Sequence, residues 1–154
     1  MKTNNNPRFS ELKVRYRKMK LPTKLDSTYY SAFYLRQIWD KSLISIQEQF
    51  YVVFLNQNME VIGWRNLNTG TGTECLVDVK LLSAIALQCL CCNVILAHNH
   101  PSGNLRPSKA DETLTWRIAS VLKLFDIKIL DHIILTIDGY YSFADHNIMS
   151  SQIL

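Results

Sequence analysis

Three residues whose side chains commonly bind metal ions occur at short spacings: two in the run His98-Asn99-His100-Pro101-Ser102-Gly103, and Asp111 eleven residues beyond the second histidine. In an extended strand, side chains two residues apart point to the same face, so His98 and His100 would present two imidazoles to one ion. Catalytic zinc is commonly held by three protein ligands, with water in the fourth position. We therefore expect His98, His100 and Asp111 to bind Zn²⁺ in a hydrolase site.

The surrounding sequence predicts elements that would bring these ligands together. Residues 93–97 form a short, apolar and β-branched run, which is typical of a buried strand and leads directly into the histidines. Two prolines and a glycine between residues 101 and 107 then favour a loop. Ser108 is a suitable N-cap for a helix to about residue 125, with Asp111 in its first turn. The helix would return the carboxylate to the end of the strand.

A purely structural explanation exists for part of this pattern. Ser108 and Asp111 have the spacing of a capping box, and the helix dipole favours an acidic first turn without any metal. That explanation suffices for the pair alone. It does not account for two histidines at i and i+2 that are followed by a Gly/Pro loop and an acid, and the complete set favours a metal site.

The chain from Glu48 to Phe143 resembles the RadC family, whose fold belongs to the JAB/MPN group of metalloproteins with the JAMM motif. That motif is an upstream glutamate, then His-x-His, seven residues, Ser, two residues and Asp. It is matched here at His98, His100, Ser108 and Asp111. Three further features are similar to the RadC-like branch. They are the string from His98 to Gly103, Asp131-His132 before an apolar strand, and Tyr141-Ser142-Phe143. The resemblance covers about two thirds of the chain.

Three of the glutamates that precede the histidines are candidates for the upstream position: Glu48, Glu60 and Glu74. Glu48 directly precedes Phe50 to Leu55, the strongest strand signal in the N-terminal half, as the family's glutamate precedes or opens its first long strand. We choose Glu48 as the general base. The structural alternative is a solvated charge at a strand end.

The proposed chemistry is hydrolysis of an amide bond, which the resemblance extends to peptide or isopeptide substrates. A bound Zn²⁺ lowers the pKa of its water to roughly 7 and polarises a carbonyl. Glu48 would take the proton and pass it to the leaving amine. Ser108, carried over from the family, would donate a hydrogen bond to the developing oxyanion. Asn99 and Ser102 either support the ligands or shape the loop, and the sequence does not separate these roles.

Two other readings of the motif fail on specific residues. The letters His-Asn-His also name a nuclease motif, but the residues of that motif are dispersed over a ββα element rather than adjacent. A zinc deaminase requires His-x-Glu and Pro-Cys-x-x-Cys, whereas this chain has His-x-His and no Pro-Cys-x-x-Cys. The four cysteines do not form the two spaced pairs of a structural Cys₄ zinc site.

Basic residues are concentrated at the N-terminus. Residues 1–24 contain eight basic side chains and one acidic side chain, a net charge of +7, whereas the remainder has nine basic and twelve acidic residues, a net charge of −3. We divide the chain into a basic arm at residues 1–25 and a RadC-like JAB/MPN metal-binding domain at residues 26–154.

The basic arm could bind nucleic acid by neutralising phosphates. The contrasting hypothesis is therefore a DNA repair or recombination accessory that acts as a DNA- or protein-binding module. The simpler explanation of the arm is a solvated tail or a charged edge strand.

Composition places the chain among ordinary globular proteins. Hydrophobic residues make up 47% of its 154 residues, and no run approaches the roughly 18 apolar residues that cross a bilayer. The first 25 residues lack the apolar core of a signal peptide, and four unpatterned cysteines fit a reducing compartment, so we expect a cytoplasmic location without membrane association. The sequence does not decide the oligomeric state. His132 and His146 have no assigned role, although His132 is a candidate for supporting the ligands.

Alternation of helices and strands after an initial hairpin predicts an α/β fold with a mixed central sheet. The resemblance implies the same layered α/β/α arrangement, a JAB/MPN fold with cytidine-deaminase-like architecture. We expect helices at 27–39 and 108–125, a further helix capped by Asp78, and strands at 48–55, 59–67, 93–99, 128–137 and 140–143.

Overall fold

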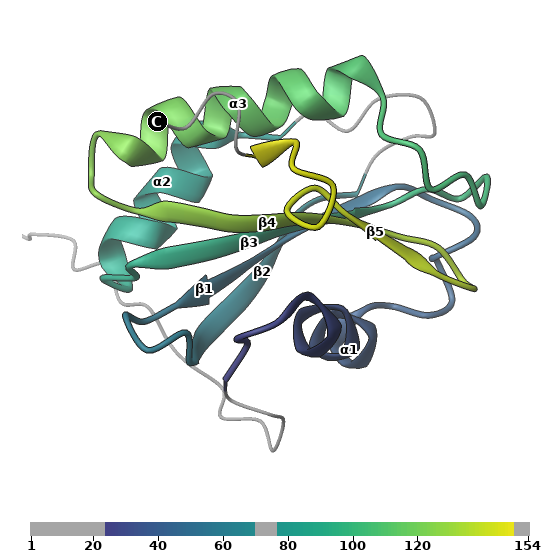
Figure 1. The fold of residues 1–154 in the computed structure, drawn as a ribbon, viewed down its shortest axis with the longest axis horizontal. Coiled ribbons are helices and arrows are strands. Elements are labelled where there is room, and N and C mark those ends of the chain that lie inside the picture. The colour runs from purple at the N-terminus through teal and green to yellow at the C-terminus, as the bar shows by residue number, and fades with distance from the viewer. Residues whose placement is uncertain (1–23, 70–76, 150–154) are drawn as a thin grey trace, which may run out of the picture.

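The computed structural model describes residues 24–69 and 77–149, which form a sheet with helices on both faces (Figure 1). One helix covers one face and two helices cover the other, so the α/β/α prediction is confirmed. In chain order the elements are α1 (Thr28–Ile38), β1 (Gln49–Leu55), β2 (Val61–Thr69), α2 (Val79–Gln88), β3 (Asn93–Asn99), α3 (Lys109–Lys123), β4 (Lys128–Leu135) and β5 (Tyr140–Ser142).

The five strands lie in the order β2-β1-β3-β4-β5, which makes β3 the central strand. β1 is antiparallel to both β2 and β3, β3 is parallel to β4, and β4 is antiparallel to β5. The sheet is therefore mixed, as predicted. β3 is buried along its whole length, because it has a strand on each side and a helical layer on each face.

Alternation along the strands divides the core into two apolar layers. Between the sheet and helices α2 and α3, Phe50, Val52 and Phe54 of β1 pack with Val94 and Leu96 of β3. On the α1 face, the intervening β1 and β3 residues pack against Leu35 and Ile38 of the helix. Every second residue of β3 thus belongs to one layer. His98 continues the layer beneath α2 and α3, and Asn99 continues the layer above α1.

Most predicted element boundaries agree with the structure to within two residues. Asp78 caps α2 and Ser108 caps α3, as expected from their positions before apolar-periodic segments. The second strand was predicted two residues too early, since Met59 has a positive φ of 62° in the hairpin turn and Glu60 follows it. The predicted basic arm, except Lys24 and Leu25, and the candidate Glu74 lie outside the described residues.

Among the described residues, no helix has the length and apolar character needed to span a membrane.

Candidate metal centre

The two histidines of the motif reach one face of the sheet at the C-terminal end of β3. His98 is 1% exposed and lies opposite Phe50 of β1, whereas His100 follows the end of the strand and is half-buried. The backbone N–H of His100 donates to the carbonyl of Leu135 at 2.9 Å, which holds this residue beside β4 after the strand has ended. The Nε2 atoms of His98 and His100 are 2.9 Å apart.

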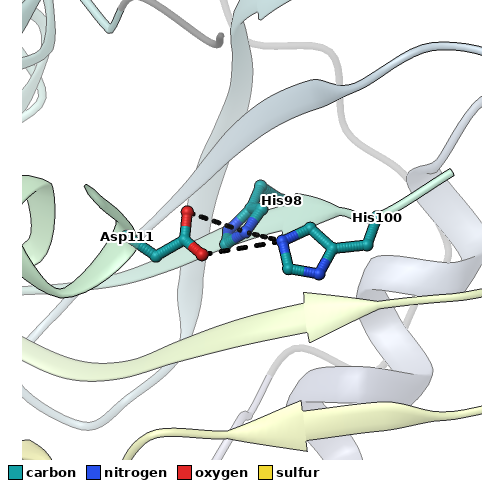
Figure 2. A group of neighbouring side chains, drawn as sticks. All are labelled: His98, His100 and Asp111. Carbon is teal, nitrogen blue, oxygen red and sulfur yellow. Dashed lines mark hydrogen bonds and ion pairs between the residues drawn. The ribbon is translucent and has the colours of Figure 1, made fainter. Parts of the chain in front are cut away.

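Asp111 completes the group from the first turn of α3, as the sequence predicts. Figure 2 shows its carboxylate facing both imidazole rings, with Oδ1 3.3 Å from Nε2 of His98 and Oδ2 3.6 Å from Nε2 of His100. One ligand atom from each residue lies within 4.8 Å of the other two, so the three could hold a single metal ion. This is the one such group among the residues that the structure describes.

The chemistry of these donor atoms fits a cation. Nδ1 of His100 lies 2.6 Å from the carbonyl oxygen of Asn104, which can only accept, so that nitrogen carries a hydrogen. A neutral His100 therefore directs the Nε2 lone pair toward Asp111. With Nε2 of His98 only 2.9 Å away, a proton or a metal ion is needed to offset the repulsion between nitrogen lone pairs.

The pKa values of His100 and Asp111 move as expected for this arrangement. The hydrogen bond with Asp111 raises the pKa of His100, burial opposes this shift, and the charge of Glu48 adds to it. Burial alone would raise the pKa of Asp111, but the adjacent side chains of His100 and His98 hold it well below its usual range. Asp111 is therefore ionised at neutral pH, as a metal ligand must be.

The capping box at the start of α3 fixes the carboxylate. Oγ of Ser108 accepts the backbone N–H of Asp111 at 3.1 Å, and Oδ2 of Asp111 accepts the backbone N–H of Ser108 at 2.7 Å. The structural and metal explanations of this pair are therefore compatible. Capping occupies a lone pair of the Ser108 hydroxyl and leaves its hydrogen for another acceptor.

Glu48 lies immediately before β1, half-buried. Phe50 is opposite His98 in the antiparallel pairing, so continuing that register by two residues places Glu48 opposite His100, on the same face. The influence of Glu48 on the pKa of His100 agrees with this placement. Glu60, by contrast, lies at the other end of β1, where its carboxylate accepts a hydrogen bond from Asn56.

Asn99, between the two histidines, faces the opposite side of the sheet and holds the backbone around Glu48. Its Oδ1 accepts the N–H of Gln49 at 2.7 Å, and its Nδ2 donates to the carbonyls of Gln47 and Ile44 at 2.9 and 2.7 Å. The sequence alone does not predict this role of Asn99, because these partners are about fifty residues away. Ser102 has a local role: its Oγ accepts the N–H of Asn104 at 3.4 Å within the loop.

His132 lies on β4 directly behind His98. Its Nε2 is 2.8 Å from Nδ1 of His98, and its Nδ1 is 2.6 Å from the hydroxyl of Thr115 on α3. Burial lowers the pKa of His132 well below its ordinary value. The sequence marked His132 only as a candidate and missed Thr115, since the relevant contact depends on the parallel pairing of β3 with β4. His146 is exposed, and its Nδ1 lies 2.8 Å from the carbonyl oxygen of Ser142.

Comparison with known proteins identifies the family to which the chain is similar. A family model described as "RadC-like JAB domain" matches residues 26–148. A UPF0758 protein of Flavobacterium johnsoniae is 44% identical over 101 residues, which cover 66% of this chain and 44% of the relative. UPF0758 protein YkfG of Escherichia coli is 42% identical over 103 residues, covering 67% of this chain and 65% of that protein. A UPF0758 protein of Porphyromonas gingivalis is 41% identical over 104 residues, covering 67% and 46%. The chain thus spans about half the length of the first and third of these relatives.

Proposed function

The chain belongs to the RadC-like JAB domain family, and from this premise we propose that it is a zinc-dependent hydrolase that cleaves a peptide or isopeptide bond. The observation that carries the proposal is the convergence of two imidazole nitrogens and one ionised carboxylate on a single point at a strand end. The proposal applies to the RadC-like JAB domain of residues 26–148.

Zinc is the metal that we propose for this site. Two imidazoles and a carboxylate make a three-ligand set of the kind that catalytic zinc sites use, with a fourth position for water or substrate. When bound, Zn²⁺ supplies a water with a pKa of roughly 7 and polarises the carbonyl under attack. His98, His100 and Asp111 would hold the ion.

Glu48 is the proposed proton carrier. Its position opposite His100 puts a carboxylate beside the ligands without making it a member of the three-ligand group. There it would accept a proton from the attacking water and deliver it to the nitrogen of the leaving amine. Asn99 supports this role, because its hydrogen bonds on both sides of Glu48 fix the backbone from which the carboxylate extends.

Ser108 is proposed to stabilise the negative charge that develops on the substrate's carbonyl oxygen. Its hydroxyl lies at the N-terminus of α3, where the helix dipole also favours negative charge. The capping box holds the hydroxyl oxygen in place through a lone pair, so its hydrogen is available for the oxyanion. A peptide or protein with a reactive amide bond is the substrate class that this arrangement suits.

The test combines metal content with amide hydrolysis. Protein purified without chelator is analysed by elemental mass spectrometry as the wild type, His100→Ala and Glu48→Gln. We expect about one zinc per chain in the wild type and Glu48→Gln, and none in His100→Ala. Hydrolysis of a library of peptides and lysine-linked isopeptides should be lost in both variants.

Two results would contradict the proposal. Absence of zinc from the wild type after reconstitution at neutral pH would remove the metal site. Stoichiometric zinc without cleavage of any amide in the library would remove the hydrolase and leave a metal-binding domain.

The charge distribution favours one alternative, a nucleic-acid-binding accessory protein. Residues 1–24 carry a net charge of +7, against −3 for the rest of the chain, and most of this basic segment lies outside the described residues. Such an arm would bind DNA with an affinity that falls steeply with salt. Deletion of residues 1–24 should abolish that binding, and binding that is absent or insensitive to salt would exclude this function.

A further inference from the structure

A chain of hydrogen bonds leads from His98 through the protein interior and back to Asp111. Nδ1 of His98 contacts Nε2 of His132 at 2.8 Å, and Nδ1 of His132 contacts Oγ1 of Thr115 at 2.6 Å. Oγ1 of Thr115 lies 2.6 Å from the carbonyl oxygen of Asp111. His98 is 1% exposed, and neither His132 nor Thr115 is exposed at all. We call this series the His132–Thr115 relay.

The chemistry of the groups sets the direction of each hydrogen bond. The carbonyl oxygen of Asp111 can only accept, so the single hydroxyl hydrogen of Thr115 is directed to it. The Thr115 oxygen must then accept from Nδ1–H of His132. The ring partners of His132 are a hydroxyl oxygen and an imidazole nitrogen, and in the tautomer that donates from Nδ1 to Thr115 its Nε2 is the acceptor that faces His98.

This assignment determines the tautomer of His98. The tautomer of His132 that carries its hydrogen on Nδ1 has a lone pair on Nε2. That lone pair accepts the Nδ1–H of His98, which leaves the Nε2 lone pair of His98 facing Asp111. The relay thus selects the form of His98 that can bind a metal ion.

We propose that His132 and Thr115 are positioning residues that fix the tautomer and orientation of His98 for metal binding. The inference rests on the proposed metal site and deepens it. Both residues act through His98 and touch neither the ion nor a substrate. Because Thr115 donates to the backbone of Asp111, the relay also joins two ligands that come from different elements, β3 and α3.

The surroundings of His132 support a positioning role over simple packing. Its ring lies between the aromatic rings of Phe50 and Phe143, with centroid distances of 5.7 and 4.7 Å. An apolar side chain could fill such a space without the cost of burying polar atoms. The polar ring is compatible with this environment because both of its nitrogens have partners, one of which is the ligand His98.

A direct test reads the tautomer in the metal-free wild-type protein. Long-range ¹⁵N–¹H correlation spectra of histidine side chains distinguish a hydrogen on Nδ1 from one on Nε2. We expect Nδ1–H for both His98 and His132. Nε2–H on either ring would overturn the proposal. This readout requires neither zinc nor activity, so it separates failure of the relay from failure of the proposed function.

A second test uses substitutions at Thr115. Thr115→Val removes the hydroxyl but keeps the shape of the side chain, and Thr115→Ser restores the hydroxyl. The matched control is Thr113→Val, because Thr113 donates to the carbonyl of Lys109 in the same helix but is exposed. Removing a group that orients a ligand typically weakens metal binding by about 10- to 100-fold. We expect this loss in Thr115→Val alone, with Thr115→Ser close to the wild type.

Substitution of His132 completes the design. In His132→Gln, the amide oxygen can accept from His98 and the amide nitrogen can donate to Thr115, whereas His132→Leu offers neither. Zinc affinity is measured by chelator competition, and ligand geometry by the visible absorption spectrum of the cobalt-substituted protein. We expect His132→Leu to lose affinity and alter the spectrum, with partial recovery in His132→Gln. Wild-type affinity and an unchanged spectrum in folded Thr115→Val and His132→Leu would overturn the proposal.

Discussion

The two faces of the sheet at the end of β3 differ in what they hold. On the face beneath α2 and α3, His98 is held through the side chains of His132 and Thr115. On the α1 face, Asn99 holds backbone atoms of the segment that precedes β1 and thereby places Glu48. Adjacent residues of one strand therefore support the proposed ligands and the proposed base through separate sets of contacts. We infer that substitutions can separate metal binding from proton transfer.

The largest effect, on zinc affinity, is expected from removing His98, the ligand on the face beneath α2 and α3. His98→Ala deletes an imidazole from the three-ligand group, so zinc affinity should fall by more than about 1000-fold, and hydrolysis should fall with it. The measurement is zinc binding by chelator competition. His146→Ala is the matched control, because it removes an exposed histidine whose contacts are the carbonyl oxygen of Ser142 and the ring of Tyr141 among the described residues. Equal affinity in His98→Ala and the wild type would show that the metal binds elsewhere.

Asn99→Leu disrupts the contacts on the α1 face and replaces the amide with an apolar side chain of similar size. The substitution leaves an N–H and two carbonyls without the Asn99 amide, and we expect a loss of about 2–4 kcal/mol in the free energy of unfolding. Because Glu48 loses its backbone support, hydrolysis should fall by about 10- to 100-fold, while zinc affinity changes less than about threefold. Urea denaturation and zinc titration measure the two quantities. A loss of zinc affinity as large as that of His98→Ala would mean that the two sets of contacts are not independent.

The pH dependence of stability should differ in sign between the metal-free and the zinc-loaded protein. The raised pKa of His100 gives the metal-free protein a stabilising contribution that is complete below 6.5 and lost as pH rises through the folded-state pKa. The lowered pKa of Asp111 contributes stability above 3.8 that is lost as pH falls toward its folded-state value. Both contributions are therefore present between pH 3.8 and 6.5.

Zinc reverses the trend on the alkaline side, since the proton on His100 competes with the ion. Zinc affinity should rise by up to about tenfold per pH unit until His100 is deprotonated. The measurement is the melting temperature of metal-free and zinc-loaded protein between pH 5 and 9. Parallel curves would indicate that His100 does not bind the metal.

The smallest effect on stability and on zinc affinity is expected at the cap of α3. Ser108→Ala removes the acceptor for the N–H of Asp111 and should lower the free energy of unfolding by about 1 kcal/mol. Ser120→Ala is the control, because Ser120 lies exposed in the same helix and donates to the carbonyl of Trp116. Zinc affinity should change little, since Asp111 retains its hydrogen bond from the backbone N–H of Ser108. A loss of more than about 3 kcal/mol would show that the hydroxyl supports more than the helix end.

The sequence predicted the parts of the site that depend on local periodicity. Strand alternation placed His98 and His100 on one face, and the spacing from Ser108 placed Asp111 in the first turn of α3. These relations hold within a few residues of chain, so they can be read without knowledge of the tertiary structure.

The supporting residues could not be predicted in this way, because their partners come from distant segments. Thr115 looks like an ordinary helical residue until the pairing of β3 with β4 brings His132 beneath α3. Asn99 acquires its role only when β1 pairs with β3. Long-range strand order, rather than local propensity, determines both sets of contacts.

The consecutive placement of His98, Asn99 and His100 has a consequence for insertions and deletions. Removing or adding one residue within β3 would exchange the faces of everything beyond it, so the imidazoles would point toward α1 and the amide toward α3. Such a change would abolish both metal binding and the support of Glu48, even though every residue of the site remained in the chain. Length variation in this domain should therefore be confined to its loops, and a transplanted site would need to carry the strand with its neighbours rather than the motif alone.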